Sequence, residues 1–121
     1  MIITLCIPPA ILSPNKQSHW AVKARRAKKY RAEARIAAIA AFNELGVDPP
    51  RFATASIKCR FYYRNKARRD ADNSMASIKS GIDGLTDAGV WIDDSGVTWL
   101  PVELLHDPRK PRLEIEIEGN H

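Results

Sequence analysis

Three aspartates have the residue type and the spacing that binding of a divalent cation requires. Asp70 and Asp72 are two residues apart, so in an extended segment both carboxylates point to the same side of the backbone. Asp94 follows in a later turn. Two carboxylates held close together repel each other unless a cation lies between them, and carboxylate oxygens suit Mg²⁺. A cation bound there would neutralise charge on a phosphodiester and lower the pKa of a bound water, as in a metal-dependent nuclease.

Lys79 is a candidate to assist this chemistry. Helical steps of 100° over seven residues bring it to nearly the same face as Asp72, where an ammonium could stabilise charge on a phosphate or orient a water. A simpler interpretation stays open, in which Asp72 caps a helix and Asp93 and Asp94 occupy a turn. The spacing also leaves open whether Asp93 or Asp94 is the third ligand.

Basic side chains gather in two runs that precede the aspartates. The chain has 19 Lys and Arg against 14 Asp and Glu, a net charge of +5. One run lies within residues 16 to 35 and the other within residues 58 to 69, which contain no acid. A basic front beside an acidic cluster favours a polyanionic partner and a cation site. The cations expected to bind DNA phosphates are Arg25, Arg26, Lys28, Lys29, Arg64, Lys66, Arg68 and Arg69.

Length and composition predict a single domain over residues 1–121, since 45% of the residues are apolar. No apolar run approaches the roughly 20 residues of a membrane span, and the N-terminus lacks the basic region of a signal peptide. Cys6 and Cys59 make neither a disulfide framework nor a zinc site. We therefore expect a cytoplasmic protein with reduced thiols, no membrane partner and no small-molecule cofactor.

The elements that must position the aspartates begin with four strands. Short β-branched or alternating apolar runs predict them over residues 2–7, 53–63, 97–106 and 112–118. Asp70 and Asp72 follow the second of these strands, and Asp94 precedes the third. If the two strands are neighbours, we expect their loops to reach the same edge of the sheet and the three carboxylates to converge.

Two helices complete the predicted order β-α-β-α-β-β. Ser18 can cap a long helix that ends at Gly46, and Asp72 or Asn73 can cap a second that ends at Gly89. The pattern predicts an α/β (α+β) domain with a mixed four-stranded sheet and a frayed tail over residues 119–121.

The stretch from Arg69 to Ser95 resembles the RusA-type Holliday junction resolvases. The matching residues are Arg69-Asp70-Ala71-Asp72-Asn73 and, over residues 83–94, Asp-Gly-Leu-Thr-Asp-Ala-Gly-Val-Trp-Ile-Asp-Asp. Pro8-Pro9, Ser13-Pro14-Asn15 and His19-Trp20 are similar to the opening loop of the family. The resemblance covers nearly the whole chain with the order of elements intact.

This resemblance implies a homodimeric endodeoxyribonuclease of phage or prophage type that uses Mg²⁺ or Mn²⁺ to nick branched DNA symmetrically. The implied substrate is a four-way junction in recombination and repair, inside a bacterial or phage-infected cell. By position, Asp70, Asp72 and Asp94 are the catalytic metal ligands and Lys79 is the functional lysine. Lys79 lies seven residues after Asp72, where the best-known family member has four. The alternative is a catalytically inactive prophage remnant that only binds DNA.

Three residues near the first helix carry further alternatives. Trp20 could stack on a splayed base and His19 could reach a phosphate, or the pair could fasten the helix end to the core. Asn15 could order its loop or touch DNA.

Overall fold

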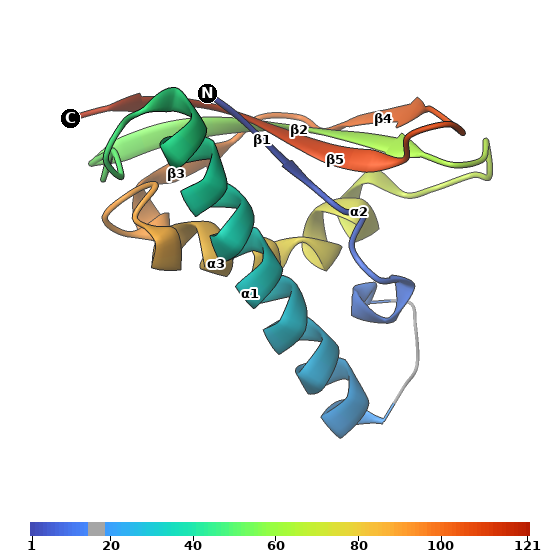
Figure 1. The fold of residues 1–121 in the computed structure, drawn as a ribbon. Helices are drawn as coiled ribbons and strands as arrows, with labels where there is room; N and C mark the ends of the chain where they lie inside the picture. Colours follow the sequence, from blue (N-terminus) through green and yellow to red (C-terminus); the bar gives the residue numbers. More distant parts are fainter. Residues whose placement is uncertain (15–18) are drawn as a thin grey trace.

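The computed structural model describes residues 1–14 and 19–121, in which three helices lie against one face of a mixed β-sheet (Figure 1). The strands are β1 (Ile2–Leu5), β2 (Thr54–Tyr63), β3 (Val97–Trp99), β4 (Glu103–His106) and β5 (Arg112–Asn120). The helices are α1 (Trp20–Leu45), α2 (Ala71–Ser77) and α3 (Lys79–Ala88), with 3-10 turns η1 (Ala10–Leu12) and η2 (Asp94–Gly96). The predicted α+β class is confirmed.

The sheet has the strand order β1-β5-β2-β3, and β4 also pairs with β2. β5 is antiparallel to both of its neighbours, whereas β3 and β4 run parallel to β2. The strand predicted over residues 97–106 is therefore two strands in line, and the sheet has five strands rather than four. Pro101 lies in the interruption, where its missing N–H cannot extend the ladder.

α2 and α3 form the crossover that the parallel pair β2–β3 requires. The register pairs Ala55 with Val97, so β3 begins beside the N-terminal end of β2. The ten residues of β2 extend about 30 Å. α2 lies near the other end of β2, as Figure 1 shows. The crossover thus carries the chain from one end of the sheet back to the other.

The single helix predicted before Gly89 is broken into α2 and α3 at Ile78, whose ψ of 4° departs from helical geometry. Ile78 is fully buried, so the break allows both short helices to pack on the core. The predicted caps, Asp72 and Asn73, are also wrong. Asp70 caps α2, because its carboxylate accepts hydrogen bonds from the N–H groups of both residues.

α1 begins at Trp20, one residue later than a cap at Ser18 would place it, and His19 provides the cap by accepting from the N–H of Ala21. Ser18 and Asn15 lie outside the described residues. The helix ends at Gly46 in the left-handed conformation, with φ of 68°, as predicted. Its buried stripe consists of Tyr30, Ala34, Ala38 and Phe42.

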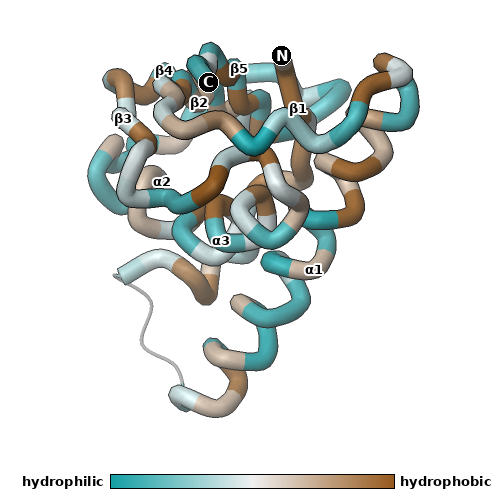
Figure 2. Tube along the Cα trace, turned by 90° about the vertical axis from the view of Figure 1, so that its left-hand side faces the viewer, coloured by the Kyte–Doolittle hydropathy of each residue, from teal (hydrophilic) through white to brown (hydrophobic). Residues whose placement is uncertain are grey.

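Close packing of α1 on α3 depends on Gly84. A Cβ atom at this position would lie 2.2 Å from the carbonyl oxygen of Arg31 and 2.8 Å from the Cβ of Ala34. The N-terminal turns of α1 extend beyond the rest of the domain (Figures 1 and 2). None of the described helices is long and apolar enough to cross a membrane.

The C-terminal residues are ordered in β5 rather than frayed. Asn120 pairs with Thr54, and its carbonyl accepts from the N–H of Ala53 at 2.9 Å. Phe52 covers Gly119, where a Cβ would clash with its ring. Extra backbone pairing with β2 therefore outweighs the polar composition of this tail.

Candidate active site and nucleic-acid interface

Asp70 lies just beyond the C-terminal end of β2, in a segment that begins with the loop over residues 64–69. Its Oδ1 accepts from the N–H of Asp72 at 2.8 Å and of Asn73 at 3.4 Å. Its Oδ2 has no hydrogen-bond partner within residues 1–14 and 19–121. One oxygen of Asp70 therefore orders α2, and the other belongs to an exposed side chain and can accept from, or bind, a ligand. Asp72 is exposed in the first turn of α2.

A cleft of about 710 Å³ borders Asp70. It lies between the segment that joins β1 to η1 and the residues of α2, so it brings together parts of the chain that are about 60 residues apart. Its lining residues are Ile7, Pro8, Pro9, Ala10, Ser13, Tyr63, Arg68, Arg69, Asp70, Asn73, Ser74 and Ser77.

Arg69 closes the loop that leads to Asp70. Its guanidinium lies over the ring of Tyr63, 3.8 Å from the ring centroid, which is a cation–π contact. Its Nη1 donates to the carbonyl oxygens of Asn65 and Ala67, and its Nη2 donates to Oδ1 of Asn65. Arg69 thus holds the loop shape, in addition to its predicted role as a phosphate contact.

The other cations of this loop are exposed. Arg64, Lys66 and Arg68 form no ion pair with any residue that the structure describes. Unpaired guanidinium and ammonium groups beside a cleft are suited to binding phosphates. Of these three predicted contacts, Arg68 lines the cleft beside Asp70, and Arg64 and Lys66 lie in the loop that leads to it.

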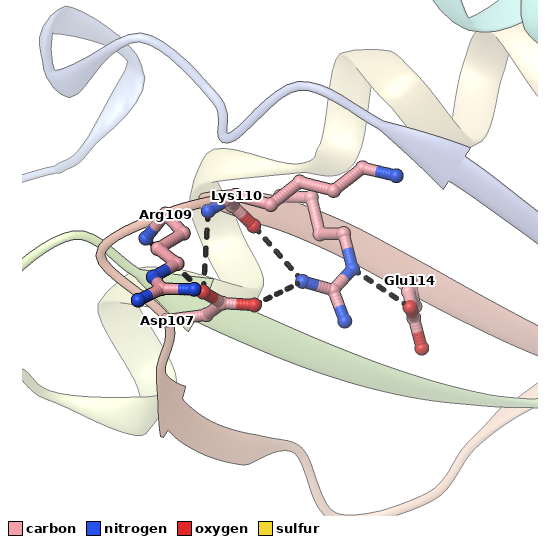
Figure 3. A network of polar contacts seen from close by, with 5 residues as sticks. Asp107, Arg109, Lys110 and Glu114 are labelled. Atoms are coloured by element: carbon pink, nitrogen blue, oxygen red, sulfur yellow. Dashed lines mark hydrogen bonds and ion pairs between the residues drawn. The ribbon is translucent and has the colours of Figure 1, made fainter.

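The turn between β4 and β5 adds two cations that the sequence prediction missed. In Figure 3, one oxygen of Asp107 accepts from the N–H groups of Arg109 and Lys110, and the other pairs with Arg112 at 2.9 Å. This carboxylate is thereby occupied, and neither Arg109 nor Lys110 has an ion-pair partner among the described side chains. Two adjacent cations in an Asp-Pro-Arg-Lys-Pro turn were the sequence signal available.

This turn is fixed against the loop that precedes Asp70. The N–H of Asp107 donates to the carbonyl of Tyr63 at 2.9 Å, and Nε2 of His106 lies 3.1 Å from the carbonyl oxygen of Arg64. A hydrogen bond from Arg112 holds the pKa of Asp107 below its usual range. The C-terminal end of β2 is therefore a cationic surface around the Asp70 cleft.

Asp94 occupies a different environment, in η2 at the N-terminal end of β3. Asp93 caps η2 by accepting from the N–H of Ser95 at 3.2 Å, and this contact lowers the pKa of Asp93. A hydrogen bond shared with Asp93 raises the pKa of Asp94, and the negative charge of Asp83 raises it further. The ammonium of Lys79 acts in the opposite direction, so Lys79 lies in the electrostatic neighbourhood of Asp94.

The three predicted ligands do not meet within one chain. No group of three His, Cys, Asp or Glu side chains that could hold a metal occurs among the described residues. The reason is the parallel crossover, because the loop that leaves the first strand of such a unit and the loop that enters the second lie at opposite edges of the sheet. The expectation that Asp70, Asp72 and Asp94 converge on one edge is therefore wrong for the single chain. The break at Ile78 likewise removes the continuous helix that related Lys79 to Asp72.

The sequence model of the family described as Endodeoxyribonuclease RusA matches residues 12–118 of the 121 residues. The chain belongs to the RusA family. Membership of this family implies an endodeoxyribonuclease that acts on Holliday junctions. The match includes all four predicted catalytic residues. A search of curated proteins found no match.

The remaining predicted DNA contacts of this RusA family member lie on α1. Arg25, Arg26, Lys28 and Lys29 are exposed on the N-terminal half of the helix, which extends away from the sheet (Figure 2). Trp20 is 76% exposed and stacks on His19 with 5.8 Å between ring centroids. The alternative in which this pair fastens the helix end to the core is therefore wrong, and the indole is available to a partner.

Proposed function

We propose that this protein is a metal-dependent, structure-selective endodeoxyribonuclease that resolves Holliday junctions or related branched DNA by paired nicking. The observation that carries the proposal is the exposed carboxylate of Asp70 in a cleft whose surroundings are cationic. A scissile phosphate can approach this carboxylate despite its negative charge, because Arg68 and Arg69 line the same cleft. The exposed Arg64 and Lys66 of the loop that leads to Asp70 add positive charge. The biological setting we propose is recombination and repair in the bacterial or phage-infected cytoplasm.

The cation in this proposal is Mg²⁺ or Mn²⁺, bound by carboxylates of two subunits. Within one chain, the pair Asp70 and Asp72 lies near one end of β2 and Asp94 lies near the other end. The three carboxylates of a single chain are therefore too far apart to bind one cation together. A twofold homodimer can bring the Asp94 end of each chain to the Asp70 end of the other and form two equivalent sites. Two such sites would cut two strands of a twofold-symmetric junction.

When bound, the cation would neutralise charge on the phosphodiester and activate a water. The chain's own residues would hold the DNA and the ligands in place. Asp70 orders α2 and thereby positions Asp72. Lys79 lies close enough to Asp94 to influence its ionisation, which supports a role for this lysine at the Asp94 half of the composite site.

The test is cleavage of a labelled four-way junction with Mg²⁺ by Asp72→Asn. We expect a loss of at least about 100-fold in the rate, because a cation ligand contributes several kcal/mol to stabilising the developing charge. Asp48→Asn removes the same charge at an exposed site outside both candidate regions and should cut at the wild-type rate. Undiminished cutting by Asp72→Asn would overturn the proposed mechanism.

The alternative, a protein that binds DNA without cutting it, is favoured by the absence of a complete carboxylate set within the described part of one chain. Thermal unfolding separates the two functions. A cation that binds the native protein raises Tm by mass action, so Mn²⁺ or Mg²⁺ should raise Tm of the nuclease. A constant Tm in both metals, together with tight junction binding, would favour the binding-only function.

A further inference from the structure

The cleft beside Asp70 contains groups that the proposed cutting mechanism does not use. One wall comes from the segment after β1, where Ile7, Pro8 and Pro9 line the cleft with apolar side chains. Pro8 is buried and Pro9 is half-buried, so this wall is part of the packed domain. An apolar wall beside a cationic rim is unsuited to binding phosphate alone, and it is suited to the flat face of a nucleobase.

Asn73, in α2, also lines the cleft and is half-buried. Its N–H is held by Asp70, so its position is coupled to that of the candidate catalytic carboxylate. Its side-chain amide has no hydrogen-bond partner within the described ranges 1–14 and 19–121. A side-chain amide offers one acceptor and two donor hydrogens, the pattern that recognises a base edge.

The floor of the cleft, by contrast, has its polar groups paired. The hydroxyls of Tyr63 and Ser74 lie 2.7 Å apart, and the hydroxyl of Ser77 donates to the carbonyl of Ser74 at 2.7 Å. Ser74 and Ser77 are buried. The Tyr63–Ser74 contact ties α2 to the end of β2, and the Ser77–Ser74 contact lies within α2, so the floor of the cleft has few polar groups left for a ligand.

The size of the cleft agrees with this chemistry. Its volume of about 710 Å³ lies within the range of roughly 300–1,000 Å³ that is typical of small-molecule sites. We propose that this cleft binds a single unstacked nucleotide of the DNA strand beside the cleaved phosphodiester, with its base between the Pro8–Pro9 wall and the amide of Asn73. The inference rests on the proposed nuclease function, because it takes the phosphate next to Asp70 as the one that is cut.

Such a site would connect branch recognition with cutting. Extruding a nucleotide costs a few kcal/mol in a paired duplex and least where pairing is already interrupted. A nucleotide at a branch point can therefore enter the cleft more easily than one within an arm. The hydrogen bonds of Asn73 would then make cutting depend on which base enters, at a level of about 5-fold to 150-fold between bases.

The first experiment measures binding without cutting. A four-way junction carries the fluorescent base 2-aminopurine at successive positions across the branch point, and it is mixed with Asp72→Asn to prevent cleavage. We expect a several-fold rise in fluorescence at one position on each cut strand, because unstacking removes quenching. Adding Ala10→Trp should abolish the rise, since Ala10 lines the cleft and an indole would fill it. Ala40→Trp, on an exposed part of α1, is the matched control and should leave the rise intact.

No rise at any position, or a rise that persists with Ala10→Trp while binding is unchanged, would overturn the proposal. A competition measurement with free deoxynucleoside monophosphates distinguishes DNA from a free nucleotide as the occupant of the cleft. Competition for the fluorescence signal by micromolar monophosphate would assign the cleft to free nucleotides rather than to DNA and would likewise overturn it. Persistence of the signal at that concentration supports the DNA nucleotide.

The second experiment measures base preference in cutting. Junctions that differ only in the base at the fluorescent position are compared by kcat/KM for the wild type, Asn73→Leu and Asn43→Leu. Leucine keeps the size of asparagine and removes both hydrogen-bonding groups, and Asn43 is exposed near the end of α1. We expect the ratio of kcat/KM between the best and the worst base to fall toward one in Asn73→Leu but not in Asn43→Leu. The junction Kd of Asn73→Leu should change by less than about twofold, since phosphate contacts dominate affinity.

An unchanged base preference in Asn73→Leu would overturn the assignment of Asn73. The experiments can reject the nucleotide site and the nuclease function independently of each other. Wild-type cutting with no unstacking signal and no base preference would leave the nuclease function standing and remove the nucleotide site. An unstacking signal that depends on Ala10, in a protein that does not cut, would support the site and remove the nuclease function.

Discussion

The two ends of β2 carry opposite electrostatics. At the C-terminal end, the exposed Arg68 lines the cleft beside Asp70, and the β4–β5 turn carries two further exposed cations. The pKa of Asp107 in that turn is lowered by its hydrogen bond to Arg112. At the N-terminal end, Asp94 lies beside Asp93 and Asp83, and its pKa is raised. The positive charge at the C-terminal end can attract a phosphate, whereas the clustered carboxylates at the N-terminal end would be stabilised by a cation. This contrast supports our proposal that each end holds half of a metal-dependent phosphodiesterase site, which a second chain would complete.

Mixing two inactive variants is the strongest test of this contrast. Asp72→Asn and Asp94→Asn should each lower junction cleavage by at least about 100-fold as homodimers. If each site combines Asp70 and Asp72 of one chain with Asp94 of the other, a heterodimer of the two variants has one intact site. The mixture should then nick one strand of a junction without resolving it, as seen on a denaturing gel. Lack of nicking by a verified heterodimer would show that the site does not span two chains.

The separation of the two ends depends on how the crossover packs, which Gly84→Ala disturbs. The added Cβ would meet the backbone carbonyl of Arg31, which cannot move as a side chain can. We expect the free energy of unfolding to fall by about 3 kcal/mol, measured by urea denaturation. Gly46→Ala is a useful contrast, because no atom lies within 4 Å of its added Cβ and only the strain of φ +68° opposes it. A smaller loss in Gly84→Ala than in Gly46→Ala would contradict the packing argument.

Removal of cations from the C-terminal end should weaken DNA binding in a salt-dependent way. For Arg64→Ala/Arg68→Ala we expect junction Kd to rise about tenfold near 0.1 M salt and the slope of log K against log salt to become shallower by about 1.8. The control Arg51→Asn/Lys58→Gln removes the same charge. Arg51 lies at the other end of the sheet and Lys58 is paired with Glu103. Equal effects of the two double variants would show that net charge, rather than placement, governs binding.

The smallest effect expected is on the pH dependence of stability. The pKa of Asp107 is lowered in the folded protein, so its charged form stabilises the fold above the ordinary value of 3.8 and this contribution is lost as pH falls below it. The pKa of Asp94 is raised, so its ionisation above 3.8 disfavours the fold. Asp107→Asn should lower Tm at pH 7, and Asp94→Asn should raise it, with both differences vanishing near pH 2. Shifts of the same sign at pH 7 would contradict the electrostatic contrast.

Much of the local structure follows from neighbouring residues. The alternation over residues 53–63 predicted β2, and Gly46 and Gly89 ended helices in the left-handed conformation. Pro101 was a sequence signal for the interruption of the edge strand, although the prediction treated residues 97–106 as one strand. The break at Ile78 has no comparable signal, because it results from packing both short helices on the core.

The candidate site divides in the same way. The sequence by itself determined the three aspartates, Lys79 and the basic runs, because residue types and short spacings define which groups can bind cations and phosphates. Only the tertiary structure decided which of these groups are neighbours. The direction of β3 beside β2 placed Asp94 away from Asp70, and long-range packing brought Pro8–Pro9 to Asn73. The physical reason is that side-chain periodicity depends on a few adjacent residues, whereas the pairing direction of strands depends on the crossover between them.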